Sequence, residues 1–171
     1  MKQVQQISKF LFYLTRIASF SYLLMAIFGL VSFAFKTQNF VLTKGVENFQ
    51  INFPFSNTPF LVGQNNSYAV WEMILGILLY GLFFWLLSNV FNAFAQPKLF
   101  TEKSVKKLTA FYLANFIIPI LMLLFLIINQ NYSASFWSVA LLHILLGVFI
   151  YFMTVIFKQG LHLQNEQDLY I

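Results

Sequence analysis

The feature that most constrains this chain is a run without formal charge, residues 133–157, which contains His143 and ends at Lys158. At a rise of about 1.5 Å per residue, a run of this length forms a helix of roughly 37 Å. The hydrocarbon core of a bilayer is about 30 Å thick. The run is therefore long enough to cross a membrane as a single helix.

Three further runs of the chain are predominantly apolar, two of them with a single charged residue near one end, Arg16 and Glu72. The chain is 60% hydrophobic and 9% charged, whereas a soluble domain carries about 25% charged residues. The first run is longer than the apolar region of a signal peptide, about 7–15 residues, so we expect it to be an uncleaved span. The sequence predicts an all-α integral membrane protein, a four-transmembrane-helix bundle forming one domain over residues 1–171, with spans at about residues 12–35, 69–95, 108–128 and 133–157.

The distribution of basic residues predicts the orientation of these spans. With four spans, both ends of the chain lie on the same side of the membrane. Lys36 and Lys44 fall on the other side, in the loop 36–68. Basic residues accumulate in the cytoplasm, so we expect cytoplasmic termini, a cytoplasmic tail 158–171 and localisation in a bacterial inner membrane. Eight of the ten basic residues lie on the predicted cytoplasmic side: Lys2, Lys9, Arg16, Lys98, Lys103, Lys106, Lys107 and Lys158.

The long loop 36–68 carries a strand signal. Aromatic and aliphatic side chains alternate with polar ones over residues 49–55, which is typical of a half-buried strand. Pro54 places this strand at a sheet edge, because proline cannot donate a ladder hydrogen bond. Residues 60–62 follow a turn and are able to return alongside it. We expect a small extracytoplasmic loop or β-hairpin lying over the bundle.

Motifs that carry catalysis or ligand chemistry are missing. The chain has no cysteine, which excludes disulfides, thiol redox chemistry and cysteine metal sites. It has no phosphate-cradling glycine loop, no metal-binding helix motif and no nucleophile elbow. We therefore predict no enzyme, no catalytic residue, no cofactor and no metal. The net charge of +5 comes from lysines beside apolar runs, which indicates membrane orientation rather than direct nucleic-acid binding.

Four polar residues stand out in or at the ends of the spans: Arg16, Asn92, Asn115 and His143. His143 shares a helix face with small residues, so it is either a proton- or metal-responsive group or a neutral imidazole bonded to an Asn or Ser of a neighbouring helix. The second interpretation is favoured, because a lone histidine makes a poor metal site. Arg16 extends to the headgroups or pairs with an acid of the tail.

Two segments resemble a known family. The tail carries the pattern G-x-x-L-Q-x-E-x-D-L-x-I, at Gly160, Leu163, Gln164, Glu166, Asp168, Leu169 and Ile171. Leu99, Phe100 and Thr101, followed by residues 105–108, are similar to a second segment of the same family. The chain thus resembles a family of bacterial four-span membrane proteins catalogued as domain of unknown function 2975. The resemblance implies an inner-membrane protein of uncharacterised activity, whose gene is often found beside a small helix-turn-helix regulator.

We predict a non-enzymatic anchor or regulator that docks a soluble cytoplasmic partner, such as a helix-turn-helix regulator. The tail keeps aliphatic side chains outside the membrane, which indicates that they are buried against another surface. We expect the tail to fold back onto the basic segment, residues 98–107, where lysines are also attracted to the lipid bilayer. The predicted docking residues are Phe100, Thr101, Lys103, Lys106, Lys107, Gly160, Leu163, Gln164, Glu166, Asp168, Leu169 and Ile171.

The alternative is a small transporter or channel subunit. In that case His143, Asn115 and Asn92 line a polar path through the helices. The sequence leaves open whether the chain forms a homo-oligomer.

Overall fold

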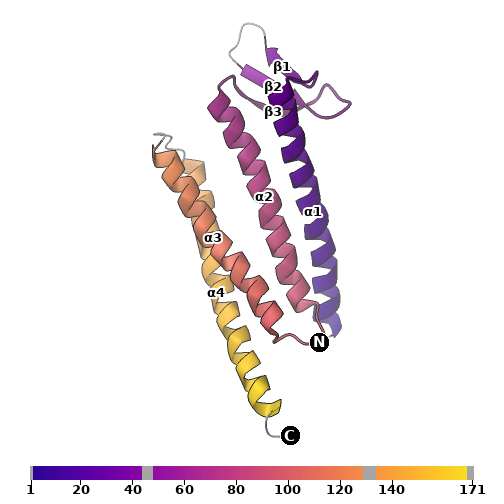
Figure 1. Ribbon diagram of the computed structural model, residues 1–171, viewed down its shortest axis with the longest axis vertical. Helices are drawn as coiled ribbons and strands as arrows, with labels where there is room; N and C mark the ends of the chain where they lie inside the picture. The colour runs from indigo at the N-terminus through magenta and orange to yellow at the C-terminus, as the bar shows by residue number, and fades with distance from the viewer. Residues whose placement is uncertain (1, 44–47, 129–133, 169–171) are drawn as a thin grey trace. The chain divides into compact units, whose positions relative to one another are not determined.

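The computed structural model describes residues 2–43, 48–128 and 134–168. Its four helices, α1 (Lys2–Phe35), α2 (Ser67–Phe94), α3 (Glu102–Ile128) and α4 (Ala134–Asp168), are all long and apolar enough to cross a membrane. Three strands separate α1 from α2: β1 (Phe40–Thr43), β2 (Asn48–Asn52) and β3 (Pro59–Gln64) (Figure 1). The four predicted helices are therefore present. Residues 129–133, between α3 and α4, lie outside the described residues.

The helices extend past the apolar runs that identified them. α1 begins at Lys2 rather than near residue 12, α3 begins at Glu102 rather than residue 108, and α4 continues to Asp168 rather than ending near residue 157. A helix needs only its own backbone hydrogen bonds, so polar turns continue it outside an apolar layer. Apolar runs mark the part suited to a membrane, not the ends of the helix.

The chain forms two compact units. We call residues 16–85 the sheet unit, and residues 1–15 with 86–171 the helical unit. α1 and α2 each contribute one part to each unit.

In the sheet unit, the three strands form one antiparallel sheet in the order β1-β2-β3. Phe40 pairs with Ile51 across the first ladder, and Phe49 pairs with Gly63 across the second. Phe49 and Ile51 are fully buried. They form a core with Val70 and Ile74 of α2. The sheet thus covers the adjoining ends of α1 and α2, whose apolar side chains complete the core.

The predicted hairpin corresponds to β2 and β3, but two details of the prediction are wrong. β2 is the central strand rather than an edge, because it ends at Asn52 and Pro54 lies in the turn beyond it. The chain also forms a third strand, β1, where only a loop was expected. Its pairing with β2 gives the sheet the three strands that independent stability usually requires.

Helices α1 and α2 run antiparallel in the sheet unit, since Ser19 meets Gly81 and Gly29 meets Ile74. The hydroxyl of Ser19 donates a hydrogen bond of 2.8 Å to the carbonyl oxygen of Gly81. A Cβ on Gly81 would lie 2.8 Å from the side chain of Leu23, so only glycine permits this approach. Small residues thus allow a close helix contact of the kind common in membranes.

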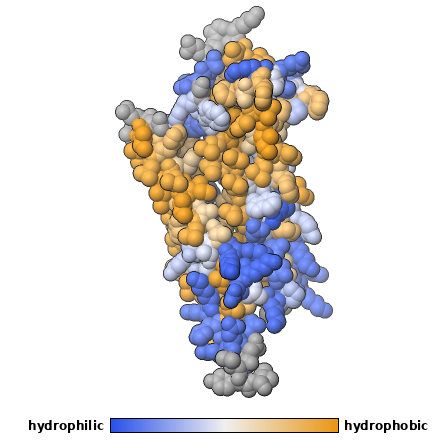
Figure 2. All heavy atoms as spheres, viewed as in Figure 1, coloured by the Kyte–Doolittle hydropathy of each residue, from blue (hydrophilic) through white to orange (hydrophobic). Residues whose placement is uncertain are grey.

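Helices α3 and α4 run antiparallel in the helical unit. Residues rising along α3 meet residues falling along α4: Tyr112 packs edge to face on Tyr151, and Asn115 contacts His143. Figure 2 shows apolar side chains gathered over the middle of the helices and hydrophilic ones at their ends.

Candidate functional site

The basic segment, residues 98–107, connects α2 to α3. Pro97 follows the end of α2, since a proline cannot continue the helical hydrogen-bond ladder. The Thr101 hydroxyl oxygen then accepts a hydrogen bond of 3.1 Å from the backbone N–H of Ser104, and Glu102 lies in the first turn of α3. Thr101 is therefore the N-cap of α3. Three of the four lysines in the segment therefore lie on a helix rather than in a loop.

One lysine of the segment is tied to α2. The ammonium group of Lys107 donates a hydrogen bond of 2.9 Å to Oδ1 of Asn92. The same Oδ1 accepts a hydrogen bond of 2.8 Å from the amide of Gln96. A charged donor makes a stronger hydrogen bond than a neutral one, so Lys107 holds the start of α3 against the end of α2.

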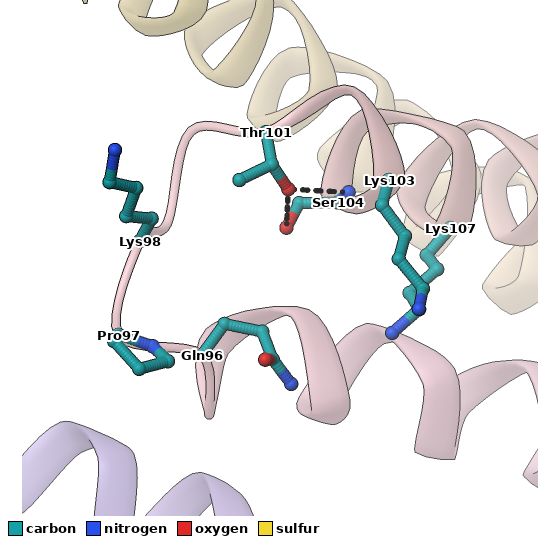
Figure 3. Close-up of a pocket in the computed structure, with 7 residues that line it drawn as sticks. All are labelled: Gln96, Pro97, Lys98, Thr101, Lys103, Ser104 and Lys107. Carbon is teal, nitrogen blue, oxygen red and sulfur yellow. Dashed lines mark hydrogen bonds between the residues drawn. The ribbon is translucent and has the colours of Figure 1, made fainter.

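A pocket of about 330 Å³ opens beside these residues. Figure 3 shows Lys103 and Lys107 directed to one side of it, Lys98 on the opposite side, and the hydroxyls of Thr101 and Ser104 turned toward each other between them. The two hydroxyl oxygens are 2.9 Å apart. The pocket is lined by Gln96, Pro97, Lys98, Thr101, Lys103, Ser104 and Lys107, none of which is acidic.

The tail meets the basic segment at one point. A Cβ on Gly160 would lie 2.6 Å from the ring of Phe100, so the absence of a side chain at Gly160 allows this ring to pack on α4. Phe157, one turn earlier on α4, packs edge to face on Phe100 with ring centroids 5.4 Å apart. Phe100 and Gly160, two predicted docking residues, are therefore in direct contact.

The predicted fold-back of the tail is wrong. Residues 158–168 continue α4 without a break. Glu166 lies 3.4 Å from His162, one turn before it, rather than among the lysines of the basic segment. A polar sequence with this i, i+4 pair is compatible with helix, and the helix carries the tail straight on from its contact with Phe100.

Beyond this contact the tail is largely exposed. Leu163 has 60% of its side chain exposed, and Gln164 is half-buried. The side chain of Asp168, and Leu169 and Ile171, lie outside the described residues. The tail therefore presents an aliphatic side chain to its surroundings where the apolar run has already ended.

Among the polar residues of the spans, the structure brings together Asn115 and His143. Oδ1 of Asn115 lies 2.8 Å from Nδ1 of His143. The amide nitrogen of Asn115 donates a hydrogen bond of 2.8 Å to the carbonyl oxygen of Phe111, which turns Oδ1 toward the imidazole. Oδ1 can only accept, so Nδ1 of His143 carries the proton and donates. This is the Asn-bonded imidazole that the sequence analysis favoured.

The other two polar residues are engaged elsewhere. Asn92 binds Gln96 and Lys107 beside the pocket. In the sheet unit, the guanidinium carbon of Arg16 lies 3.8 Å from the centroid of the Trp85 ring, a cation–π contact. The structure thus does not join Asn92 to Asn115 and His143 as one polar group.

Sequence reasoning missed part of the pocket. Gln96, Pro97, Lys98 and Ser104 line it but were not among the predicted site residues. Lys106, which was, is exposed and does not line it. The signal was available in the helical spacing, because Lys103 and Lys107 are four residues apart and share a face once α3 begins at Glu102.

Within the described residues, no group of three or more His, Cys, Asp or Glu side chains is placed to hold a metal ion. Comparison with known proteins finds no matching family model, no similar curated protein and no similar solved structure.

Proposed function

We propose that this is an integral membrane protein of a bacterial inner membrane, with four spans and both termini in the cytoplasm. The four long apolar helices support the spans. The excess of lysine and arginine on one side of these spans supports the orientation. In this arrangement the basic segment and the end of α4 lie at the cytoplasmic surface, and the three-stranded sheet lies on the opposite side.

Its function is that of a non-enzymatic anchor or regulator that docks a soluble cytoplasmic partner. The observation that carries this proposal is the exposure of Leu163 on a helical extension beyond the apolar run of α4. Covering an aliphatic side chain of this size releases about 1.5–3 kcal/mol. The contact of Gly160 with Phe100 holds the extension at a defined position beside the basic segment, so a partner meets a preformed surface.

The composition of this surface indicates the kind of partner. Lys103 and Lys106 are exposed beside the tail's attachment point, so they favour an acidic face on the partner. The resemblance of the tail and basic segment to the family of domain of unknown function 2975 adds a specific candidate, a helix-turn-helix regulator encoded by a neighbouring gene. This surface would hold such a regulator at the membrane through a protein–protein contact, and the membrane protein would not contact nucleic acid.

The test compares two co-purifications of the regulator encoded by the neighbouring gene, one with the wild-type full chain and one with its Leu163→Ser variant. The substitution removes exposed aliphatic surface. Because it breaks no buried contact, α4 should remain folded. The regulator should co-purify with the wild type and be at least tenfold depleted with Leu163→Ser.

The matched control is Gln167→Ser, which changes an exposed polar residue one turn further along the same helix. Its co-purification should equal that of the wild type. Equal recovery with Leu163→Ser and Gln167→Ser would remove the basis for docking on this surface.

A further inference from the structure

The pocket beside the basic segment has the charge of an anion site. Three of its seven lining residues are lysines, and none is acidic. Within the described residues, neither Lys98 nor Lys103 forms an ion pair with an acidic side chain. Figure 3 shows Lys103 and Lys107 directed to the same side of the pocket, where their like charges repel each other. A bound anion would offset that repulsion.

The neutral groups of the pocket favour an oxygen-rich anion. If the Thr101 hydroxyl donates to Ser104 across their 2.9 Å contact, the hydroxyl hydrogen of Ser104 remains able to donate to a ligand. The amide hydrogens of Gln96 are donated to Asn92, so Gln96 forms a wall rather than a donor. The ammonium groups of Lys98 and Lys103 and the hydroxyl of Ser104 make a set of donors that suits a phosphate group.

We infer that this pocket binds a phosphate group, presented either by an anionic phospholipid headgroup or by a free phosphate. Its volume of about 330 Å³ is at the small end of ligand pockets, about 300–1,000 Å³, which fits a headgroup rather than a large cofactor. The inference goes beyond the proposed function, because it needs no protein partner. The headgroup as source rests on the proposed membrane topology; the free phosphate does not.

The depth of the pocket agrees with a headgroup source. The apolar part of α3 begins at Leu108, and Lys103 lies about five residues, or roughly 7 Å, before it. The headgroup layer of a bilayer extends over about 5–7 Å on each side of the hydrocarbon core. Lys103 and Lys107 therefore fall at the level where lipid phosphates lie if α3 crosses the membrane.

The test compares two double variants of the full chain that remove the same charge. Lys98→Gln with Lys103→Gln removes two lysines of the pocket. Lys106→Gln with Lys158→Gln removes two exposed lysines outside it. All four side chains are exposed, so both variants should fold, and equal thermal unfolding temperatures in sodium chloride would verify this.

Two probes distinguish the sources. In nonionic detergent, thermal unfolding is followed with sodium phosphate against sodium chloride at equal ionic strength. Native mass spectrometry measures retention of phosphatidylglycerol against phosphatidylcholine. We expect the wild type and the control variant to respond to at least one probe, and the pocket variant to bind about 25-fold more weakly, fivefold for each lysine removed.

A response to phosphatidylglycerol identifies a lipid headgroup as the source, and a response to sodium phosphate identifies free phosphate; either supports the inference. Equal loss of binding in both double variants would show that the probes are attracted to basic charge in general, and would contradict a phosphate site in the pocket. So would the absence of any response in the wild type. Co-purification of the soluble partner is measured on the same variants, so failure of the phosphate site and failure of partner docking are separate results.

Discussion

The contact between Asn115 and His143 shows how a pair of polar residues is accommodated between two apolar helices. Asn115 is fully buried, and each polar atom of its amide has a partner: Phe111 on its own helix and His143 on α4. An unpaired amide in such surroundings would be costly. The pairing gives His143 a structural role as the donor that satisfies Asn115, which is the interpretation the sequence favoured over a metal-responsive group.

This role predicts unequal effects of two substitutions at His143. His143→Leu leaves Oδ1 of Asn115 without its donor and should lower the free energy of unfolding by about 0.6–2 kcal/mol, the range for hydrogen bonds between membrane helices. His143→Asn keeps a donor and should cost less. Unfolding in mixed micelles measures both. Equal stability of the Leu variant and the wild type would contradict the structural role.

The contact of Gly160 with Phe100 predicts another difference between two matched substitutions. In Gly160→Ala the new methyl group would lie 2.6–2.7 Å from the ring of Phe100, which has to move, so we expect a loss of about 1–3 kcal/mol. A Cβ on Gly76 would meet nothing within 4 Å, so Gly76→Ala should be neutral or stabilising by up to about 1 kcal/mol. Unfolding of the two variants in the same micelles measures the difference.

If the overlap between the new methyl group and the ring of Phe100 is the cause, replacing the ring with a smaller side chain should relieve it. Phe100→Leu combined with Gly160→Ala should recover part of the stability that Gly160→Ala loses. A double variant no more stable than Gly160→Ala alone would show that the tail does not depend on this contact.

At the scale of elements, the sheet depends on one aromatic side chain. Phe49 is fully buried between the strands and α2, whereas Phe55, in the same loop, is fully exposed at a backbone φ of 60°. Phe49→Ala should open the sheet, since such truncations cost about 3–5 kcal/mol. Phe55→Ala should have little effect. Limited proteolysis of the loop 36–66 measures the opening rate, which should rise sharply for Phe49→Ala alone; similar rates for both variants would contradict a sheet held by Phe49.

The elements also show what the sequence was able to predict. Long apolar runs identified all four helices, because only apolar side chains suit a membrane over that length. Alternation identified β2, since one face of that strand is buried on α2. β1 was missed because Phe40–Thr43 is too short to show a period of its own and is defined by its pairing with β2. The straight course of the tail was not predicted, because polar turns carry no burial signal.

The candidate site, too, could be predicted from the sequence only in part. Phe100, Thr101 and Gly160 were predicted from a pattern in the chain, and the structure brings Phe100 and Gly160 into contact. The pocket was missed, since it forms only when the end of α2 and the start of α3 come together around Asn92. Lys107 and Asn92 are fifteen residues apart in the chain, so their contact cannot be recognised in a single run of sequence.

For the whole molecule, the distribution of charge predicts the orientation that every cytoplasmic proposal requires. Eight basic residues against two favour cytoplasmic termini. The chain has no cysteine, so single cysteines introduced into it can be labelled without background. Ser104 is a poor labelling site because it is buried, but Asn65, Lys98 and Gln167 are exposed and sample both sides. Asn65 lies just after the sheet, Lys98 before α3, and Gln167 near the end of α4.

In intact cells, an impermeant maleimide should label a cysteine at position 65 and should not label one at position 98 or 167. After the membrane is permeabilised, all three should react, which shows that the last two are protected by the membrane rather than by burial. Labelling at positions 98 and 167 but not at 65 would show that the protein lies in the membrane in the opposite orientation. The basic segment, the tail and the phosphate pocket would then face away from the cytoplasm, and no cytoplasmic regulator could reach Leu163. Labelling at 98 without 167 would mean that one of the two helices between these positions, α3 or α4, does not cross the membrane, because an odd number of spans would then separate them.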